Sequence, residues 1–154
     1  MEEIKEQIIL TNMCMIIDER NNKVVCIDRL KGWKGIAFPG GHIEQGEPIY
    51  LSMIREVKEE TNLDITNLKL VGVRDWYEKD KNLRNIVFIF RTTSFKGELS
   101  SGTEEGKVFW LPIEDLHKVK LAEGFDQEID LFEDNNNVTE IYSDNIMGLN
   151  YKKY

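Results

Sequence analysis

The sequence predicts an α+β protein that combines a mixed sheet with one long amphipathic helix. Two observations support this class: most apolar runs have the composition of strands, and a helical hydrophobic period is sustained only after Glu47. Strands and helix do not alternate in a regular βαβ order, so a purely parallel sheet is not expected. A chain of 154 residues is expected to form one domain, residues 1–154.

The first strands are predicted on either side of a short polar connection. Residues 7–18 and 23–29 are rich in strand-forming residues, and the connection ERNN between them favours a hairpin with Asn at its turn. Residues 30–41 are punctuated by Gly and Pro. They predict a loop with a short strand near Ile36 to Phe38.

The helix follows this loop. Pro48 suits the first helical position, and Ile49, Met53 and Val57 recur at the spacing of one helical face. Asn62 is expected to end the helix, because Asn tolerates the left-handed conformation that follows many helix C-termini.

The remainder of the chain predicts shorter elements. Residues 68–78 and 84–95 read as two strands joined by the polar KDKNL, and residues 96–106 as a loop. Residues 107–112 predict a short strand, followed by short helical segments at 113–119 and 124–132. Residues 137–142 favour a final strand or an ordered tail.

Composition limits the possible partners. A net charge of −8 argues against a nucleic-acid polymer, because phosphate contacts require Lys and Arg. A small anionic substrate stays possible if a bound cation reverses the local field. No apolar run approaches a membrane span, so no membrane partner is expected and the cytoplasm is the default location. Cys14 and Cys26 lie in apolar runs and are expected to be buried thiols.

Three carboxylates near the end of the helix require an explanation. Glu56, Glu59 and Glu60 lie where the partial negative charge of a helix C-terminus disfavours acids. At 100° per residue they share one face, and Glu60 falls between Ile49 and Met53 on the core stripe. A divalent cation such as Mg²⁺ would compensate the crowded charge. The alternative is a solvated charged face, stabilised only weakly by an Arg55–Glu59 pair.

This segment resembles the Nudix box, G-x5-E-x7-R-E-U-x-E-E-x-G-U, in which U is a bulky aliphatic residue. One fixed position differs: Asn62 stands where the family has Gly. Asn is the next-best residue for a positive φ, so we expect the turn to be kept. The positions that match are Gly41, Glu47, Arg55, Glu56, Val57, Glu59, Glu60 and Leu63.

The resemblance implies an α/β/α sandwich with a mixed sheet and a loop–helix–loop catalytic motif. It implies that the carbonyl of Gly40 and the carboxylates of Glu56, Glu59 and Glu60 bind Mg²⁺ or Mn²⁺, and that one of these acids also acts as base. By the same resemblance Arg55 orients a catalytic Glu. Gly41 and Glu47 are then structural residues of the motif.

Weaker patterns, FPGGHIEQGE and VFWLPIEDL, resemble the MutT-type branch over most of the chain. That branch often adds an acidic ligand five or six residues before the Trp of the second pattern, which is Trp110 here. Glu104 and Glu105 are the candidates, and a solvated loop is the alternative. The branch also places base-contacting groups near residues 125–127, where no individual residue is assigned.

Two other residues are candidates for substrate contact. Trp33 lies in the Gly-rich loop before the box, where an aromatic face could stack on a nucleobase. Trp76 and Trp110 favour the alternative, because aromatic residues in strands more often belong to the core. His42 could donate a hydrogen bond behind the metal ligands, although an exposed His in a turn is the simpler interpretation.

The function implied is that of a Mg²⁺-dependent pyrophosphohydrolase. It would cleave a nucleoside triphosphate, such as the oxidised purine nucleotide 8-oxo-dGTP, to a nucleoside monophosphate and pyrophosphate. A hydrolase of a nucleoside diphosphate conjugate such as ADP-ribose is an alternative. A non-catalytic nucleotide-sensing module is another, although a pure binder has no need of the costly acids. The enzyme is expected to act as a monomer or a homodimer.

Overall fold

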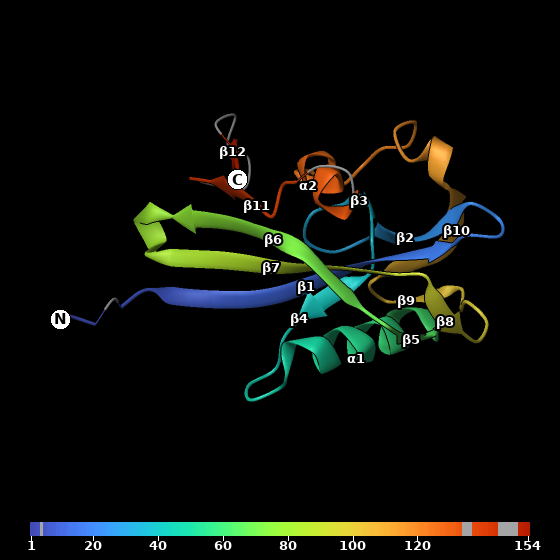
Figure 1. The fold of residues 1–154 in the computed structure, drawn as a ribbon, viewed down its shortest axis with the longest axis horizontal. Coiled ribbons are helices and arrows are strands. Elements are labelled where there is room, and N and C mark those ends of the chain that lie inside the picture. Colours follow the sequence, from blue (N-terminus) through green and yellow to red (C-terminus); the bar gives the residue numbers. More distant parts are fainter. Residues whose placement is uncertain (4, 134–136, 145–150) are drawn as a thin grey trace.

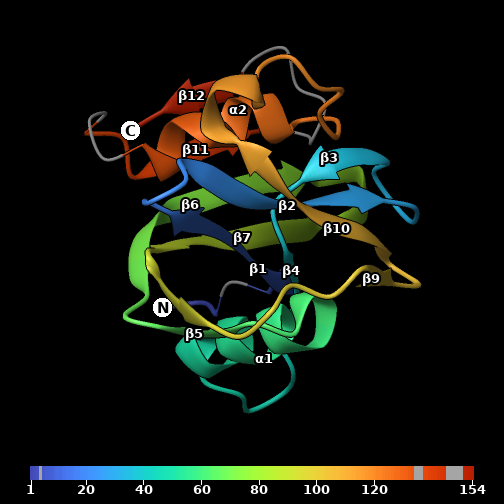
Figure 2. The same cartoon turned by 90° about the vertical axis from the view of Figure 1, so that its right-hand side faces the viewer.

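A computed structural model describes residues 1–3, 5–133, 137–144 and 151–154. The chain forms three layers, with a twisted mixed sheet between helix α1 (Ile49–Thr61) on one face and helix α2 (Phe125–Phe132) on the other (Figures 1 and 2). This arrangement confirms the predicted α+β class and the expected sandwich. Two 3₁₀ turns occur in connections, at Lys79–Lys81 and Ile113–Asp115.

One half of the sheet is built around a parallel pair. Strand β1 (Gln7–Asp18) runs parallel to β7 (Leu83–Thr92), and β7 pairs with the antiparallel β6 (Lys69–Glu78). On the far side of β6 lies β11 (Glu140–Ser143), which is parallel to it, and then β12 (Tyr151–Lys153). The mixture of parallel and antiparallel pairs is what the irregular order of the segments predicted.

The other half of the sheet is antiparallel. Strand β2 (Lys23–Arg29) pairs with β10 (Gly106–Pro112) on one side and with β3 (Gly35–Ala37) on the other. Strand β9 (Gly102–Thr103) extends β10. Strand β4 (Gly40–His42) belongs to the first half, where it pairs with β1 in antiparallel orientation. A separate two-stranded sheet joins β5 (Asp64–Thr66) to β8 (Ser94–Lys96).

Strand β1 changes partners along its length. Residues 7–16 pair with β7, whereas β2 is reached only at Ile17 and Asp18, the last two residues of the strand. Earlier in β1, residues 11–13 pair with β4 instead. The sheet therefore parts between β1 and β2, and this parting creates room for a cleft.

Helix α1 differs from the prediction at its start and agrees with it at its end. Pro48 is the N-cap with an extended backbone (φ −60°, ψ 136°), so it precedes the first helical residue instead of occupying that position. The carbonyl of Pro48 still accepts the N–H of Ser52 at 2.9 Å. Asn62 has φ 66° and ψ 5°, which confirms the expected left-handed conformation, and its N–H donates to the Lys58 carbonyl at 3.0 Å.

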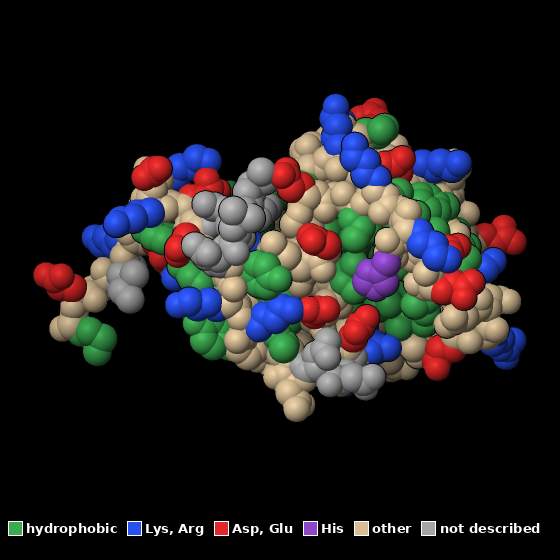
Figure 3. Space-filling model, turned by 90° about the horizontal axis from the view of Figure 1, so that it is seen from above, with side chains coloured by type: hydrophobic (Ala, Val, Ile, Leu, Met, Phe, Trp, Pro, Cys, Tyr) green, Lys and Arg blue, Asp and Glu red, His purple; other side chains and the backbone are tan. Residues whose placement is uncertain are grey.

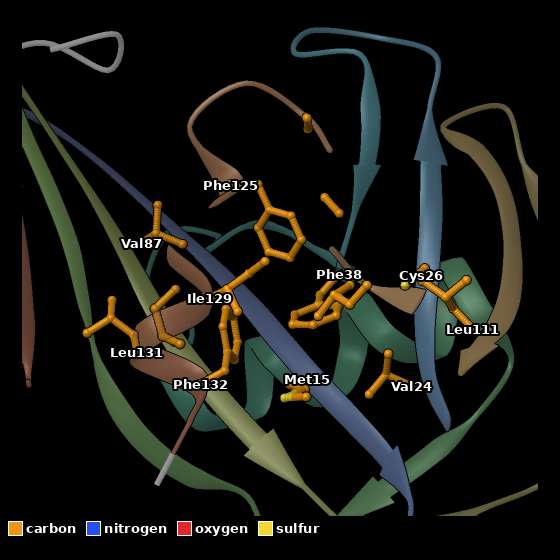
Figure 4. Close-up of a cluster of buried hydrophobic side chains, with 14 of the residues drawn as sticks. Met15, Val24, Cys26, Phe38, Val87, Leu111, Phe125, Ile129, Leu131 and Phe132 are labelled. Carbon is orange, nitrogen blue, oxygen red and sulfur yellow. The ribbon is translucent and has the colours of Figure 1, made fainter. Parts of the chain in front are cut away.

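The two faces of the sheet bury separate apolar clusters. The cluster under α2 includes Phe38, Phe125 and Phe132, whose rings meet edge to face at centroid distances of 4.8 to 6.4 Å (Figure 4). The cluster over α1 includes Met53, Val57 and Leu63. Cys14 and Cys26 are buried and free, as predicted, and burial raises the pKa of both thiols.

Most of the long strands were predicted correctly, and most of the short ones were not. The predicted ranges 7–18 and 23–29 match β1 and β2. The predicted strand 84–95 is in fact β7 followed by β8, and the loop 96–106 contains β9. The segment 113–119 holds only a 3₁₀ turn. Residues 137–142 contribute to β11, whereas β4, β5 and β12 gave no signal, because strands of three residues are too short to show a period.

The surface seen in Figure 3 carries acidic and basic side chains interspersed over one face. The excess of acids therefore does not gather there into a single patch. Within the described ranges, no helix combines the length and the apolar character needed to cross a membrane.

Candidate active site

The end of α1 buries one carboxylate and half-buries another. Glu60 is only 8% exposed, and its Oε2 accepts the N–H of Gly40 at 3.0 Å. Burial raises the pKa of Glu60 to about 8, although the bond from Gly40 opposes this shift. Burial also raises the pKa of Glu56, against the opposing effect of Arg55. Acids held in this way are stabilised by a cation, because desolvation disfavours their charged form.

Arg55 ties the loop to the helix. Its Nε and Nη2 donate to the carboxylate of Glu47 at 2.9 and 3.0 Å, and Nη2 also donates to the His42 carbonyl at 3.0 Å. Its Nη1 donates to Glu56 at 2.9 Å and to Glu59 at 3.2 Å. The guanidinium keeps the pKa of Glu47 below its usual value. Arg55 therefore orients two box acids while anchoring a third.

Glycines at the start of the box allow the loop to approach the helix. A Cβ atom at Gly41 would overlap the carboxylate of Glu56, and one at Gly40 would overlap the backbone carbonyl of Asn12. Any side chain at either position would push the loop away from α1 or from β1. The two glycines are thus required by close packing, since neither has a positive φ.

Asn12 fixes the same loop from the sheet, and sequence reasoning missed it. The side chain is 3% exposed; its Oδ1 accepts the N–H of Gly41 at 3.0 Å, and its Nδ2 donates to Ser52 Oγ at 2.8 Å. Ser52 in turn donates to the Ile49 carbonyl at 2.6 Å. A polar amide within the apolar run TNMCMII was the signal, because a buried amide needs specific partners.

A cleft of about 1140 Å³ joins the box to the face covered by α2. This volume is slightly above the usual range of small-molecule and cofactor sites, about 300–1,000 Å³. The box end is lined by Asn12, Gly40, Gly41, His42, Glu56, Glu59 and Glu60. The far end, here called the aromatic end, is lined by Trp33, Phe38, Trp76, Asn85, Val87, Phe125 and Glu128.

Glu104 and Glu105 also line the cleft. Their carboxylates lie near Lys31 and, within the described residues, form no hydrogen bond with the box glutamates. Lys31 Nζ lies 3.7 Å from Glu104 and 3.8 Å from Glu105. The side chain of Glu104 is 94% exposed and that of Glu105 is 54% exposed. The charge of Glu105 raises the pKa of Glu60, so Glu105 acts electrostatically on the box.

The tryptophans divide between the cleft and the core. Trp33 lines the cleft, and its ring meets that of Trp76 edge to face at 5.9 Å. Trp76 is 4% exposed and lines the cleft as well, so it contributes more to this site than its place in a strand suggested. Trp110 packs on Phe95 in the cluster over α1. The exposed His42 lines the box end, where its backbone carbonyl contacts Arg55.

Carboxylate oxygens are the ligands that a hard divalent cation such as Mg²⁺ prefers. In the observed side-chain conformations, however, the oxygens of Glu56, Glu59 and Glu60 do not point to a common position. No three His, Cys, Asp or Glu side chains in the described part of the chain are close enough together to hold a metal ion. The reason is visible in the contacts: Glu56 and Glu59 both turn to Arg55, and Glu60 turns to Gly40. Rotation of these carboxylates about their side-chain bonds would direct their oxygens into the cleft.

Two further charged residues in the cleft were not singled out from the sequence. Arg29 lines it and forms no ion pair within 4.0 Å among the described residues, and its charge lowers the pKa of both Glu60 and Glu128. Glu128 lines the aromatic end. In the helical segment 124–132, Glu128 shares a face with Phe125, Ile129 and Phe132, and an acid on an apolar face was the signal.

Comparison with known proteins gives the family. The family model described as the NUDIX domain matches residues 10–132. The uncharacterised Nudix hydrolase YvcI of Bacillus subtilis is 34% identical over 110 residues, covering 69% of this chain and 68% of the relative. An ADP-ribose pyrophosphatase of Methanocaldococcus jannaschii is 32% identical over 114 residues, covering 73% and 65% respectively. An 8-oxo-dGTP diphosphatase of Buchnera aphidicola is 31% identical over 111 residues, covering 71% and 75%.

A solved structure gives the same result at the level of the fold. The crystal structure of the mutator protein MutT from Bacillus halodurans superposes with a TM-score of 0.76 at 25% identity, covering 94% of this chain and 97% of that one. The chain spans less than two thirds of the archaeal relative and somewhat more of the other two. The matched domain, the box residues in their places and the shared fold show that this chain belongs to the Nudix hydrolase family and has the fold of its MutT-type members.

Proposed function

We propose that the protein is a Mg²⁺-dependent pyrophosphohydrolase that converts a nucleoside triphosphate, such as 8-oxo-dGTP, to the monophosphate and pyrophosphate. The observation that carries the proposal is a cleft with clustered acids at one end and aromatic rings at the other. Such a cleft suits a ligand with a polyphosphate at one end and a base at the other. A relative named 8-oxo-dGTP diphosphatase, 31% identical over 111 residues, supports the choice.

Each group at the box end has a distinct role in this proposal. Glu56, Glu59 and Glu60, with the Gly40 carbonyl, would hold Mg²⁺ or Mn²⁺, and Glu105 lies where its charge reaches the same site. When bound, the cation lowers the pKa of water and neutralises charge on the phosphates. To bind the cation, the Glu105 carboxylate would have to break its contact with Lys31.

The chain's own residues supply positioning. Arg55 holds Glu56 and Glu59 at the box end through Nη1, so a rotation about their own side-chain bonds is what each needs to reach a cation in the cleft. Burial raises the pKa of Glu60 to about 8 in the metal-free protein, so a cation held beside this carboxylate would favour its charged form. Arg29, free of ion pairs within the described residues, offers positive charge to the phosphates between the two ends.

The proposal is tested with a panel of nucleoside triphosphates and nucleotide conjugates in Mg²⁺, with products separated by chromatography. The expected products from a triphosphate are equal amounts of monophosphate and pyrophosphate. Glu60→Gln is the matched control, because it keeps the size of the side chain and removes its charge. Release of inorganic phosphate instead of pyrophosphate, or no turnover of any triphosphate, would refute the proposal.

A second candidate is a hydrolase of nucleoside diphosphate conjugates such as ADP-ribose. It is favoured by one observation, the 32% identity to the archaeal relative named ADP-ribose pyrophosphatase. The same panel distinguishes the two, because a conjugate would yield two monophosphate products and no pyrophosphate.

A further inference from the structure

Strand β11 lies beyond the part of the chain that the family model matches, which ends at residue 132. It nevertheless joins the sheet as a parallel neighbour of β6, with Ser143 opposite Trp76 in the register (Figure 1). Gly72 of β6 makes room for this approach, because a Cβ atom there would lie 2.6 Å from the carbonyl oxygen of Thr139. The N–H of Val73 donates to the same carbonyl at 2.9 Å. Strand β6 is therefore shaped to accept β11.

A buried arginine fastens β11 to β6. The Arg74 side chain is fully buried, and its Nη1 donates to the carbonyls of Asp75 at 2.8 Å and Ile141 at 3.3 Å. Its Nη2 donates to Ser143 Oγ at 2.9 Å. Two of these three acceptors belong to β11. Burial lowers the pKa of Arg74, because desolvation disfavours a cation, so the acceptors from β11 stabilise its charged form.

The same guanidinium contacts two residues that line the cleft. Its Cζ lies 5.5 Å from the centroid of the Trp76 ring, which is a cation–π contact. Its Nε lies 4.0 Å from Oε1 of Glu128 on α2, and this Nε has no hydrogen-bond partner in the described structure. Trp76 and Glu128 are 4% and 7% exposed, and both belong to the aromatic end. Arg74 therefore connects β11 with two residues in the wall of the cleft.

We propose that Ser143 and Arg74 are positioning residues, through which β11 maintains the shape of the aromatic end. Without the Ser143 hydroxyl, Nη2 would lack its acceptor, and the carboxylate of Glu128 offers an alternative one. A guanidinium that turned toward Glu128 would leave its place beside the Trp76 ring, and the wall of the cleft would shift. The box acids lie at the other end of the cleft. Substrate binding should therefore change while the chemical step does not.

The first test rests on the proposed nucleotide hydrolysis and separates KM from kcat. Ser143→Ala is assayed with 8-oxo-dGTP and Mg²⁺. Its KM is expected to rise about three- to tenfold, while kcat stays within about twofold of wild type, because the lost contact acts on binding alone. Tyr142→Phe is the matched control. It removes a hydroxyl from the same strand, one that donates to Asp144, and should leave both constants unchanged.

Three results of this assay would overturn the proposal. One is a folded Ser143→Ala protein with the KM of wild type. Another is an equal rise in KM for Tyr142→Phe, and the third is a Ser143→Ala protein whose kcat falls as far as its KM rises. The last two would indicate that β11 acts only as a general support of the fold.

A double-mutant cycle tests the connection through Arg74 without any substrate. Ser143→Ala, Glu128→Gln and the double variant are compared with wild type by urea unfolding in chelator. Because both residues contact Arg74, the unfolding constant of the double variant should differ from the product of the single effects by about twofold or more. Asp126→Asn replaces Glu128→Gln in a control cycle, which should be additive, because Asp126 is an exposed acid on α2 outside the cleft.

Additivity of Ser143→Ala with Glu128→Gln would refute the connection. If Glu128→Gln does not fold, the comparison of KM values decides, since it does not use that variant. The cycle also separates this proposal from the proposed hydrolysis. Coupling without any release of pyrophosphate from 8-oxo-dGTP would refute the hydrolysis and leave the role of Arg74 standing, whereas turnover without coupling would refute that role alone.

Discussion

Replacing Asn12 by Ala tests whether the buried amide holds the box loop in place. The change removes the acceptor of the Gly41 N–H and the donor to Ser52 Oγ. Each hydrogen bond contributes about 1 kcal/mol net, and leaving the part-buried Gly41 N–H without a partner adds about 1–3 kcal/mol. Because Asn12 lines the cleft, water can replace part of the hydrogen bonding that the substitution removes. The unfolding free energy should therefore fall by about 2–4 kcal/mol.

The loss can be measured by urea unfolding and by thermal unfolding. For a domain of this size about 2–4 °C corresponds to 1 kcal/mol, so the midpoint should fall by roughly 5–15 °C. Mg²⁺ affinity, measured by calorimetry, should fall as well, since the loop carrying Gly40 is loosened. Thr11→Ala in the same strand is the control and should lose less, because within the described residues the Thr11 side chain makes one hydrogen bond, to the Ile86 carbonyl, and this bond is long at 3.4 Å.

A double-mutant cycle isolates the clamp itself. Ser52→Ala removes the partner of the Asn12 amide, so the double variant should be more stable than the sum of the single losses implies, by about 0.5 kcal/mol or more. An Asn12→Ala protein within about 0.5 kcal/mol of wild type, or strict additivity in the cycle, would refute the reasoning.

Four other predictions follow from the site. Chelator should abolish hydrolysis, and Mg²⁺ or Mn²⁺ should restore it and raise the melting temperature; full activity without metal would exclude the mechanism. Glu59→Gln and Glu60→Gln should each lower kcat by orders of magnitude in steady-state assays while the fold persists, and a variant that keeps most of its turnover would show that this acid is not a ligand. Asn62→Gly should retain stability in urea, whereas Asn62→Val should lose about 1–2 kcal/mol to strain at φ 66°; equal stabilities would contradict the account of the turn. Since the pKa of Glu128 rises from 4.5 to about 7 on folding, the native state keeps its proton longer, so the metal-free protein should lose stability between these pH values as pH rises. Glu128→Gln should show a shallower decline in urea unfolding across that range, and an identical slope would argue against the shift.

The box could be predicted from sequence because its residues are local and periodic. Glu60 falls on the core stripe at 100° per residue, and the structure buries it. The positive φ of Asn62 could also be predicted from local sequence, because it depends only on an Asn that directly follows a helix. These features depend on a few consecutive turns of chain, and sequence contains that information directly.

The aromatic end could not be assembled from sequence, because its residues come from distant segments. Trp33, Trp76 and Glu128 line one cleft only after β6 pairs with β7 and α2 covers the sheet. The pairing partners of three-residue strands such as β4 are equally non-local. Glu128 did carry a signal in the sequence, because it is an acid on an apolar helical face, as Glu60 is. In a helix of eight residues, however, the apolar face comprises too few residues for this pattern to be conclusive.

The change of partners along β1 has a mechanical consequence. In the ladder between β1 and β2 the two halves of the sheet are joined only at Ile17–Val24 and Asp18–Lys23. A small rotation about this junction would alter the width of the cleft while the other ladders stay intact. A ligand touching both halves resists that rotation, so amide hydrogens at the junction should exchange more slowly when the cleft is filled. Adaptation to substrates of different size can then come from the angle between two rigid half-sheets instead of from loops alone.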